Sequence, residues 1–561
     1  MEKSENNTVV REFRHMLLWP LQLRRLSREG PHQNHWEALR ARPGPWKEVR
    51  DNLLVDDETC QLGYREFVYF LPYVQRFLYG FGESDAQTPS SLHMFKRTDI
   101  AKAIVRLAED KPPIELDVER LRLTFFYDVD IALLTCEVVA RDLPLEDAVE
   151  IIDRFGRPYP PSWDGAQQPH HCSWQVEFRD NQGRLLTASD YGDRDKYLGL
   201  VRDIKQTPLS LHWENLLKPL VPAYLGGGQV QYYQIENKRI PIMSYLAFDD
   251  PNQLTRGDLA RICFAARWGD RATLPFSAAF LEDFEERYCY DRFWDPASPE
   301  LNTRYTICGP AFAMITKHGE DDRVQAFRHQ FYQIGVIVNF HKGALLNLSN
   351  RFSIAVERLR VGDYDSVRMF KRSVREALEL FLRFNHRYWF TEISHQTLAD
   401  DFYTRWSEEL RTDVLYKEVR EEARDINEYL DADRTRRFSN NAQRLTVVSA
   451  CGMVGTVVTG FLGMNLFAHA DLTSWEKTAI FFAVFVPTMI ITGYTVMISN
   501  RIANFMEALA SESLSWADKK EAFWAIWAHP RRGRVKRVAG GDHPSRRSAR
   551  RAPPDAVTTA D

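Results

Sequence analysis

Two adjacent apolar segments near the end of the chain constrain its fold more than any other feature. The first, Leu445–Phe467, has 23 residues, the second, Thr478–Ser499, has 22, and neither contains a charged residue. At about 1.5 Å per residue a helix of either length reaches roughly 33 Å, slightly more than a hydrocarbon core of about 30 Å. Residues 468–477 join them. The pattern predicts a helical hairpin across a membrane, and a pair of buried core helices is the alternative.

The basic residues predict how this hairpin is oriented. Arg436, Arg437 and Arg444 precede the first segment and Arg501 follows the second, whereas the loop between the segments carries a single Lys477. Because basic residues stay on the cytoplasmic side, both termini are expected in the cytoplasm. The apolar patch at residues 16–23 is short and interrupted, so it does not predict a signal peptide.

Charge and cysteine content narrow the function classes. The formal charge is −4, but residues 531–561 hold nine Lys or Arg against three Asp, which leaves −10 for the rest. An acidic body disfavours nucleic acid as a partner and is compatible with divalent cations. The seven cysteines form no Cys-x-x-Cys pair, and His170-His171-Cys172 is too tightly spaced to share one metal easily. We find no phosphate-binding loop, zinc-protease helix or nucleophile elbow, so we do not expect an enzyme.

The pattern before the hairpin predicts an α/β cytosolic domain with a mixed sheet, followed by a long helical stalk. Residues 1–115 are a mixed segment of unknown role, with short helices expected in 53–79 and 100–108. Residues 116–320 contain β-branched and aromatic runs at 121–129 and 131–139, a helical pattern at 145–155, and extended pairs within 173–187 and 229–248. Residues 321–444 are helical, with a break at Gly362-Asp363. The remaining divisions are 445–467 (first span), 468–477 (loop), 478–499 (second span) and 500–561 (cytoplasmic tail).

The last part of the stalk is expected to continue into the first span. Apolar residues recur at spacings of three and four from Asp400 onward, and no proline precedes the span. We therefore predict one helix from Asp400 to Leu462, about 95 Å long. The alternative is a cytosolic bundle joined flexibly to the membrane.

Small and polar residues form a stripe along the first span. Their spacings of three and four cover an arc of about 100°. Close helix packing explains such a stripe as well, because Gly452, Thr456 and Gly460 form a small-xxx-small pattern. A pore would require several copies around an axis. The stripe has no ionisable side chain; extended backward to Ser439, its members are Ser439, Thr446, Ser449, Met453, Thr456, Gly460 and Gly463.

The tripeptide Gly463-Met464-Asn465, at the outer end of the first of two C-terminal spans, resembles the signature of CorA-type magnesium transporters. Met453 and Thr456 stand where that family has a pore-lining methionine and threonine. The resemblance implies a homopentamer in a bacterial inner membrane, with a ring of Asn465 that holds hydrated Mg²⁺ as the transported ion; Mg²⁺ is also a candidate regulatory ion. Side-chain carbonyls suit this ion because it releases its water reluctantly. Since nine helical residues turn about 900°, Asn465 would point away from Thr456 unless the helix ended near Gly463.

The chain also departs from the family pattern. The loop after the tripeptide lacks the Met-Pro-Glu-Leu segment of many relatives, so cation attraction would rest on Asp471 and Glu476. Zn²⁺, Co²⁺ or Ni²⁺ transport is an alternative, as is a non-conducting membrane-anchored sensor or scaffold. The basic tail is expected to contact anionic lipid or to be solvated. For regulation the candidates include Asp400, Asp401, Asp431 and Asp433.

Overall fold

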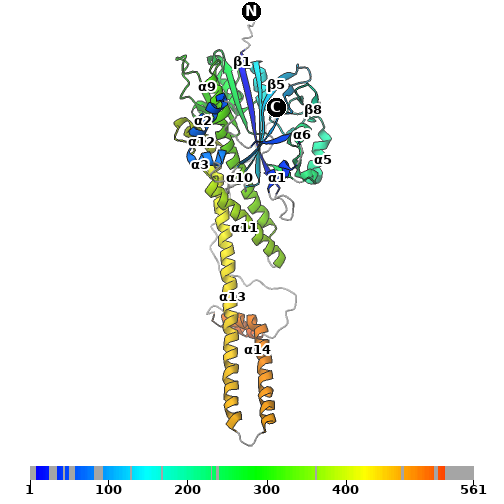
Figure 1. The fold of residues 1–561 in the computed structure, drawn as a ribbon, viewed down its shortest axis with the longest axis vertical. Coiled ribbons are helices and arrows are strands. Elements are labelled where there is room, and N and C mark those ends of the chain that lie inside the picture. The colour runs from blue at the N-terminus through cyan, green and yellow to red at the C-terminus, as the bar shows by residue number, and fades with distance from the viewer. Residues whose placement is uncertain are drawn as a thin grey trace, which may run out of the picture. The chain divides into compact units, whose positions relative to one another are not determined.

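The computed structural model describes residues 8–24, 34–41, 44–49, 57–80, 92–126, 129–165, 168–228, 230–235, 239–360, 363–468, 473–510 and 516–524. The chain divides into two compact units, Met1–Glu428 and Tyr429–Asp561. The first unit contains a 14-stranded mixed sheet and a set of helices (Figure 1). The second contains most of one long helix and two further helices.

The strands of the sheet are β1 (Val9–Leu23), β2 (Trp46–Val49), β3 (Leu92–Arg97), β4 (Lys102–Arg106), β5 (Ile114–Phe126), β6 (Ile131–Pro144), β7 (Gln175–Arg179), β8 (Leu185–Ala188), β9 (Val221–Pro222), β10 (Gln231–Gln234), β11 (Ile242–Phe248), β12 (Cys289–Tyr290), β13 (Arg304–Cys308) and β14 (Ala311–Lys317). The main path runs β12-β13-β14-β11-β1-β6-β5-β4-β7-β8. The pairs β11·β14 and β9·β10 are parallel, whereas the others are antiparallel. The predicted mixed sheet is confirmed.

The helices of the first unit are α1 (His35–Arg40), α2 (Asp57–Tyr69), α3 (Pro72–Tyr79), α4 (Leu145–Arg154), α5 (Arg194–Ile204), α6 (Leu211–Leu217), α7 (Arg256–Phe264), α8 (Phe284–Tyr288), α9 (Asp321–Ala326), α10 (Tyr332–Glu357), α11 (Tyr364–Arg387) and α12 (Thr397–Leu410). Short 3-10 turns lie at Ala223–Leu225 (η2) and Pro251–Gln253 (η3), and a π-helical turn, η4 (Phe327–Phe331), precedes α10. Next follow α13 (Thr412–Ala468), α14 (Ser474–Ala510) and α15 (Trp516–Trp524).

The first 115 residues are an integral part of the sheet, which corrects the predicted boundary at residue 116. β1 pairs with β6 from Val9 to Gln22, and its other edge pairs first with β11 and then with β10. Residues 102–106 form strand β4 rather than a helix, because they pair with β5 and β7 on both sides. The helices expected within 53–79 are present as α2 and α3.

Both faces of the sheet are covered at its centre, along β1. Side chains alternate along β1, so Phe13 and Leu17 join the core that includes α4, α6 and α7, while Met16 and Leu18 join the core that includes α3, α10 and α12. Figure 1 shows α5 and α6 on one side of the sheet and α2, α3 and α12 on the other. A strand that is covered on both faces reads as a continuous apolar run, which hides its period of two.

A buried carboxylate connects the sheet to the helical layer. Glu137 of β6 is fully buried and lies 3.2 Å from Arg14, 3.3 Å from Arg120 and 3.1 Å from Arg328. Burial acts to raise the pKa of Glu137, but the three guanidinium groups outweigh burial and lower it. Because Arg14, Arg120 and Arg328 come from β1, β5 and η4, one carboxylate holds three segments together.

The expected unbroken helix from Asp400 to Leu462 is wrong at its beginning. α12 ends at Leu410, and Arg411 has a φ of 56°, in the left-handed region that interrupts a helix. Thr412 Oγ1 then donates a hydrogen bond to the carbonyl of Ser407 at 3.2 Å. From Thr412 onward the prediction holds, because α13 continues through 57 residues.

Gly335 of α10 is expected to be intolerant of a side chain. A Cβ there would stand 2.8 Å from Leu18 Cδ1, 2.8 Å from Met243 Sδ and 3.1 Å from Trp406. Gly335→Ala should therefore lower the free energy of unfolding by about 1–3 kcal/mol, as other overpacked cores do. Gly199→Ala in α5 is the matched control, because nothing lies within 4 Å of its Cβ; it should be neutral or stabilising by up to about 1 kcal/mol. Thermal unfolding followed by tryptophan fluorescence compares the two.

Three buried histidines predict acid sensitivity of the fold. Burial lowers the pKa of His15 to about 3, of His212 to about 3 and of His341 to about 4. The unfolded chain takes up these protons near pH 6.5, so stability falls as pH drops below about 6.5 and continues to fall until about pH 3, where the folded chain takes them up as well. The unfolding temperature should drop between pH 7 and pH 5. His341→Gln should reduce that slope, whereas replacing the exposed His170 with Gln should leave it unchanged.

Candidate ion path along α13

The polar stripe occupies the uncovered side of α13. Along the stripe and its backward extension, Gly463 is partly covered and the other positions are exposed, with Met453 71% exposed; the exposed positions are Thr435, Ser439, Ala442, Thr446, Ser449, Met453, Thr456 and Gly460. On other faces of the helix, Val447 is only 7% exposed, and Gly452, Gly455 and Thr459 are partly covered. The stripe thus coincides with a surface that its own chain leaves open.

Threonine hydroxyls on α13 present acceptors outward. Thr446 Oγ1 donates to the carbonyl of Ala442 at 3.0 Å, and Thr456 Oγ1 donates to that of Gly452 at 2.9 Å. Because each hydroxyl proton is engaged with the helix backbone, the oxygen lone pairs remain to accept a hydrogen bond or to face a cation. Thr459 makes the same kind of bond to Gly455 at 2.8 Å, but from the partly covered side.

Two apolar residues flank the stripe, and the sequence pattern did not single them out. Phe438 is 78% exposed and Leu445 is 68% exposed, and on a helix of 3.6 residues per turn both fall at one edge of the polar arc. Large apolar side chains that open to solvent in a single chain commonly mark a contact surface. The stripe is therefore an amphipathic strip rather than a purely polar one.

The helix does not end at Gly463, in contrast to the prediction. α13 continues to Ala468, and Gly463 has no left-handed φ. A glycine costs only about 1 kcal/mol in a helix interior, so it does not by itself terminate one. On this continuous helix, position 464 falls within the arc of the stripe and position 465 on the side that carries Val447. The side chains of Met464 and Asn465 lie outside the described residues.

The end of α13 carries a partial negative charge from its backbone. The last four carbonyl groups of a helix have no intrahelical donor, and the helix macrodipole places roughly half a negative charge there. These carbonyls belong to residues 465–468. The tripeptide Gly463-Met464-Asn465 therefore leads directly into a cation-attracting helix terminus.

Of the two acidic residues that were predicted to attract cations, the structure describes only Glu476. Asp471 lies outside the described residues. Glu476 caps α14, because its Oε2 accepts hydrogen bonds from the backbone N–H of Thr473 at 2.9 Å and from Thr473 Oγ1 at 2.8 Å. The sequence Thr473-x-x-Glu476 is the pattern of a capping box, a signal that the sequence offered for this role. Glu476 is thus engaged in holding the helix start.

The candidate regulatory carboxylates lie on two different helices. On α12, Asp401 accepts a hydrogen bond from Tyr290 at 2.7 Å, and burial together with Glu392 and Asp401 raises the pKa of Asp400. On α13, Asp431 lies 3.5 Å from Arg434. Over the part of the chain that the structure describes, no group of three or more His, Cys, Asp or Glu side chains is placed to hold a metal ion.

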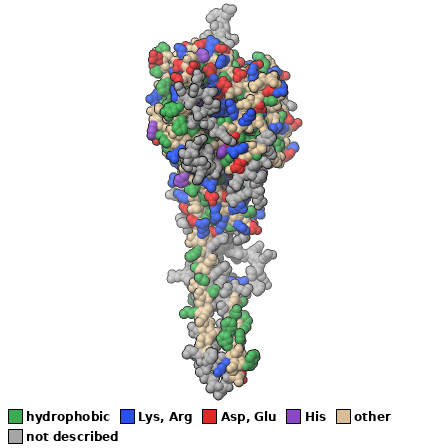
Figure 2. Space-filling view, in the orientation of Figure 1, with side chains coloured by type: hydrophobic (Ala, Val, Ile, Leu, Met, Phe, Trp, Pro, Cys, Tyr) green, Lys and Arg blue, Asp and Glu red, His purple; other side chains and the backbone are tan. Residues whose placement is uncertain are grey.

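One helical stretch within the described residues is long and apolar enough to cross a membrane. Ser474–Ile491 of α14 has a mean hydropathy of 1.3, and none of it is buried. Its exposed side chains form a broad apolar surface, which Figure 2 shows in green, made by Ile480, Phe481, Phe482, Phe485, Val486, Met489, Ile490 and Ile491. The first span, 445–467, stays a prediction.

Part of the chain matches a known protein family. Residues 366–498 match the family model described as CorA-like Mg²⁺ transporter protein. The matched region begins in α11 and includes α12, α13 and most of α14, so the predicted resemblance is confirmed over this part of the chain. That family consists of membrane-integral transporters rather than enzymes. No curated protein and no solved structure matches the chain significantly.

Replacing Gly463 tests whether the helix continues. Since its position is helical and open, with nothing within 4 Å of a Cβ, Gly463→Ala should leave the unfolding temperature unchanged or raise it. Gly319→Ala is the strained comparison, because Gly319 has a φ of 94°, and it should lower the unfolding temperature. A loss of stability at Gly463 equal to that at Gly319 would show that α13 ends before Asn465.

Proposed function

We propose that the chain forms a homo-oligomeric channel or transporter for divalent cations, most specifically Mg²⁺, in which the stripe of α13 lines the path. The match to the CorA-like family supports a divalent cation transporter. One observation carries the proposal for this site. The stripe of α13 is exposed, whereas the face of the same helix that carries Val447 is covered.

Several copies are required for such a path. One pair of helices cannot enclose water, so the exposed stripe becomes a lining only when copies surround a common axis. Phe438 and Leu445 at its edge would contact the neighbouring copy and so remove apolar surface from water. The family resemblance favours five copies, with both termini in the cytoplasm of a bacterial cell and the hairpin in its inner membrane.

The lining chemistry suits a hydrated cation. The stripe offers hydroxyl oxygens, a thioether and backbone carbonyls, without an ionisable side chain. Mg²⁺ keeps its waters, whose protons the outward lone pairs of Thr446 and Thr456 can accept.

The outer filter requires a change in α13. For Asn465 to face the axis of Thr456, the last turn must open at Gly463, where glycine accepts a left-handed conformation at low cost. We infer that assembly or ion binding opens this turn in each copy. Gly463→Ala should then keep the fold but lower flux, because alanine favours the closed helix by about 1 kcal/mol.

Flux through reconstituted vesicles tests the path. Mg²⁺, Zn²⁺, Co²⁺ and Ni²⁺ are supplied separately to the natural sequence, Asn465→Ala and Thr456→Val. Asn465→Ala removes the side-chain carbonyl that is proposed to face the ion. It should reduce Mg²⁺ selectivity at least tenfold, since a hydrogen bond to a charged group is worth about 1.5–3 kcal/mol. Thr456→Val should reduce flux several-fold, through loss of one acceptor per copy.

Matched variants make this experiment decisive. Thr459→Val removes an equivalent hydroxyl from the partly covered side and should leave flux unchanged, and Gly493→Ala is the control for Gly463→Ala. Absence of flux for every ion from correctly inserted oligomer would leave the sensor or scaffold function. Equal effects of Thr456→Val and Thr459→Val on flux would exclude the stripe as the lining. Faster flux of Zn²⁺, Co²⁺ or Ni²⁺ than of Mg²⁺ would show that one of those ions is the transported ion.

The C-terminal region is proposed to contact anionic lipid. α15 exposes Trp516 by 78% and Trp524 by 70%, and Lys519 lies 5.9 Å from the ring centre of Trp516. Exposed tryptophans beside lysine are typical of helices at a membrane surface. The basic residues of 531–561 lie outside the described residues.

A further inference from the structure

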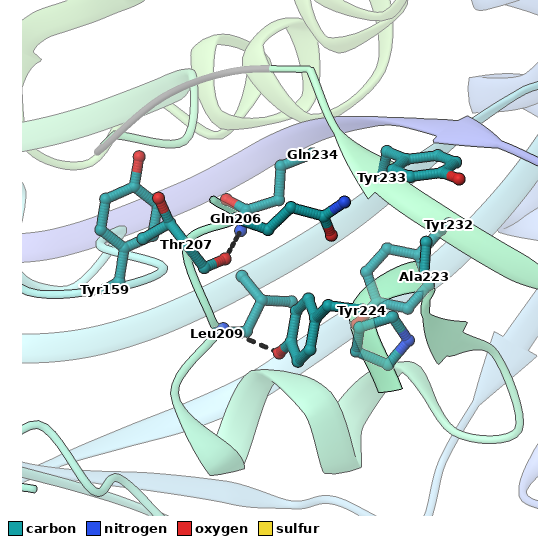
Figure 3. A pocket seen from close by; sticks show the side chains of 10 residues that line it. Tyr159, Gln206, Thr207, Leu209, Ala223, Tyr224, Tyr232, Tyr233 and Gln234 are labelled. Carbon is teal, nitrogen blue, oxygen red and sulfur yellow. Dashed lines mark hydrogen bonds between the residues drawn. The ribbon is translucent and has the colours of Figure 1, made fainter. Parts of the chain in front are cut away.

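A small cavity of about 260 Å³ lies in the first unit, where the loop 206–209 meets η2 and strand β10. Figure 3 shows its two glutamines between the ring of Tyr159 on one side and those of Tyr224 and Tyr233 on the other. Its walls are made mainly by four tyrosines and two glutamines: Tyr159, Tyr224, Tyr232, Tyr233, Gln206 and Gln234.

Two buried polar atoms of this cavity have no partner among the described residues. Tyr232 is 1% exposed, and its hydroxyl makes no hydrogen bond. Gln234 donates through Nε2 to the carbonyl of Thr207 at 3.3 Å, while its buried Oε1 accepts none. Each unsatisfied buried polar group costs about 1–3 kcal/mol, which a ligand with matching groups would recover.

One tyrosine of the aromatic wall, Tyr224, is held in place through its hydroxyl group. The hydroxyl of Tyr224 accepts from the backbone N–H of Leu209 at 2.9 Å and donates to Glu214. The Tyr224 hydroxyl therefore already acts as both a donor and an acceptor. Tyr224 contributes its aromatic ring to the cavity wall. A wall fixed in this way loses little entropy on binding.

Among the residues that the structure describes at this cavity, none is charged. A phosphate or carboxylate would enter without a counter-charge, and Glu214 behind Tyr224 disfavours an anion further. The volume lies just below the usual range of about 300–1,000 Å³ for ligand pockets, so the occupant is small. Aromatic faces with amides favour a planar, neutral, polar molecule.

We propose that this cavity binds the base of a neutral nucleoside, one that presents an N–H donor beside a ring acceptor. Gln234 Oε1 would accept from the exocyclic amino group, the Tyr232 hydroxyl would donate to the ring nitrogen, and a tyrosine face would stack on the base. The amide of Gln206 supplies a further donor and acceptor at the same cavity.

Calorimetric titration of adenosine into the detergent-solubilised full chain tests the proposal. Saturable binding at one site per chain is expected, with adenosine 5′-monophosphate no tighter than adenosine, because none of the described lining residues is charged. Tyr232→Phe should weaken adenosine binding about tenfold while leaving the unfolding temperature unchanged or higher, since it removes an unsatisfied hydroxyl.

Two further variants complete the design. Gln206→Leu, at a half-buried position, should also weaken binding, whereas Tyr305→Phe, a buried tyrosine of the opposite core, should not. The proposal is overturned if adenosine does not bind, if the monophosphate binds tenfold more tightly, if glucose binds in its place, or if Tyr305→Phe weakens binding as much as Tyr232→Phe does.

Discussion

The pairing of strand β1 along both of its edges is the constraint on which the first unit depends. β6 covers one edge from Val9 to Gln22, while β11 and β10 share the other, and both faces are buried. The break between β11 and β10 coincides with Pro20, which lacks the N–H that a partner there would need. A proline in the middle of a sheet is thus accommodated by a change of partner. Arg14 on the same strand also binds the buried Glu137.

The proposed ion path depends on a different physical rule, which acts on α13. A helix satisfies its own backbone, so its side chains alone decide what each face can contact. On α13 the threonine hydroxyls return their protons to that backbone and offer oxygen lone pairs outward. In the proposed path, neutral threonine side chains would therefore supply the hydrogen-bond acceptors. The stripe residues themselves include no ionisable side chain.

The sequence predicted those parts of the fold in which local pattern and tertiary structure agree. The strands β5 and β6, helix α4, the β7–β8 turn and the long α13 follow from periodicity and turn residues. β1 was missed because burial on both faces removes its alternation. The break at Arg411 carries no glycine or proline signal, and the continuation of α13 through Gly463 reflects an intrinsic glycine cost too small to end a helix. At the candidate site, residue types could be predicted, but which face stays uncovered could not.

The position of β1 at the start of the chain has a consequence for biosynthesis. Its last partner strands, β10 and β11, end near residue 248, so during translation the apolar strand leaves the ribosome long before they exist. At about 5–20 residues per second, that interval is on the order of ten to fifty seconds. Throughout it, a segment rich in leucine and tryptophan lacks part of its sheet. The β1 edge that later pairs with β10 and β11 therefore stays unpaired during synthesis until about residue 248 has been added.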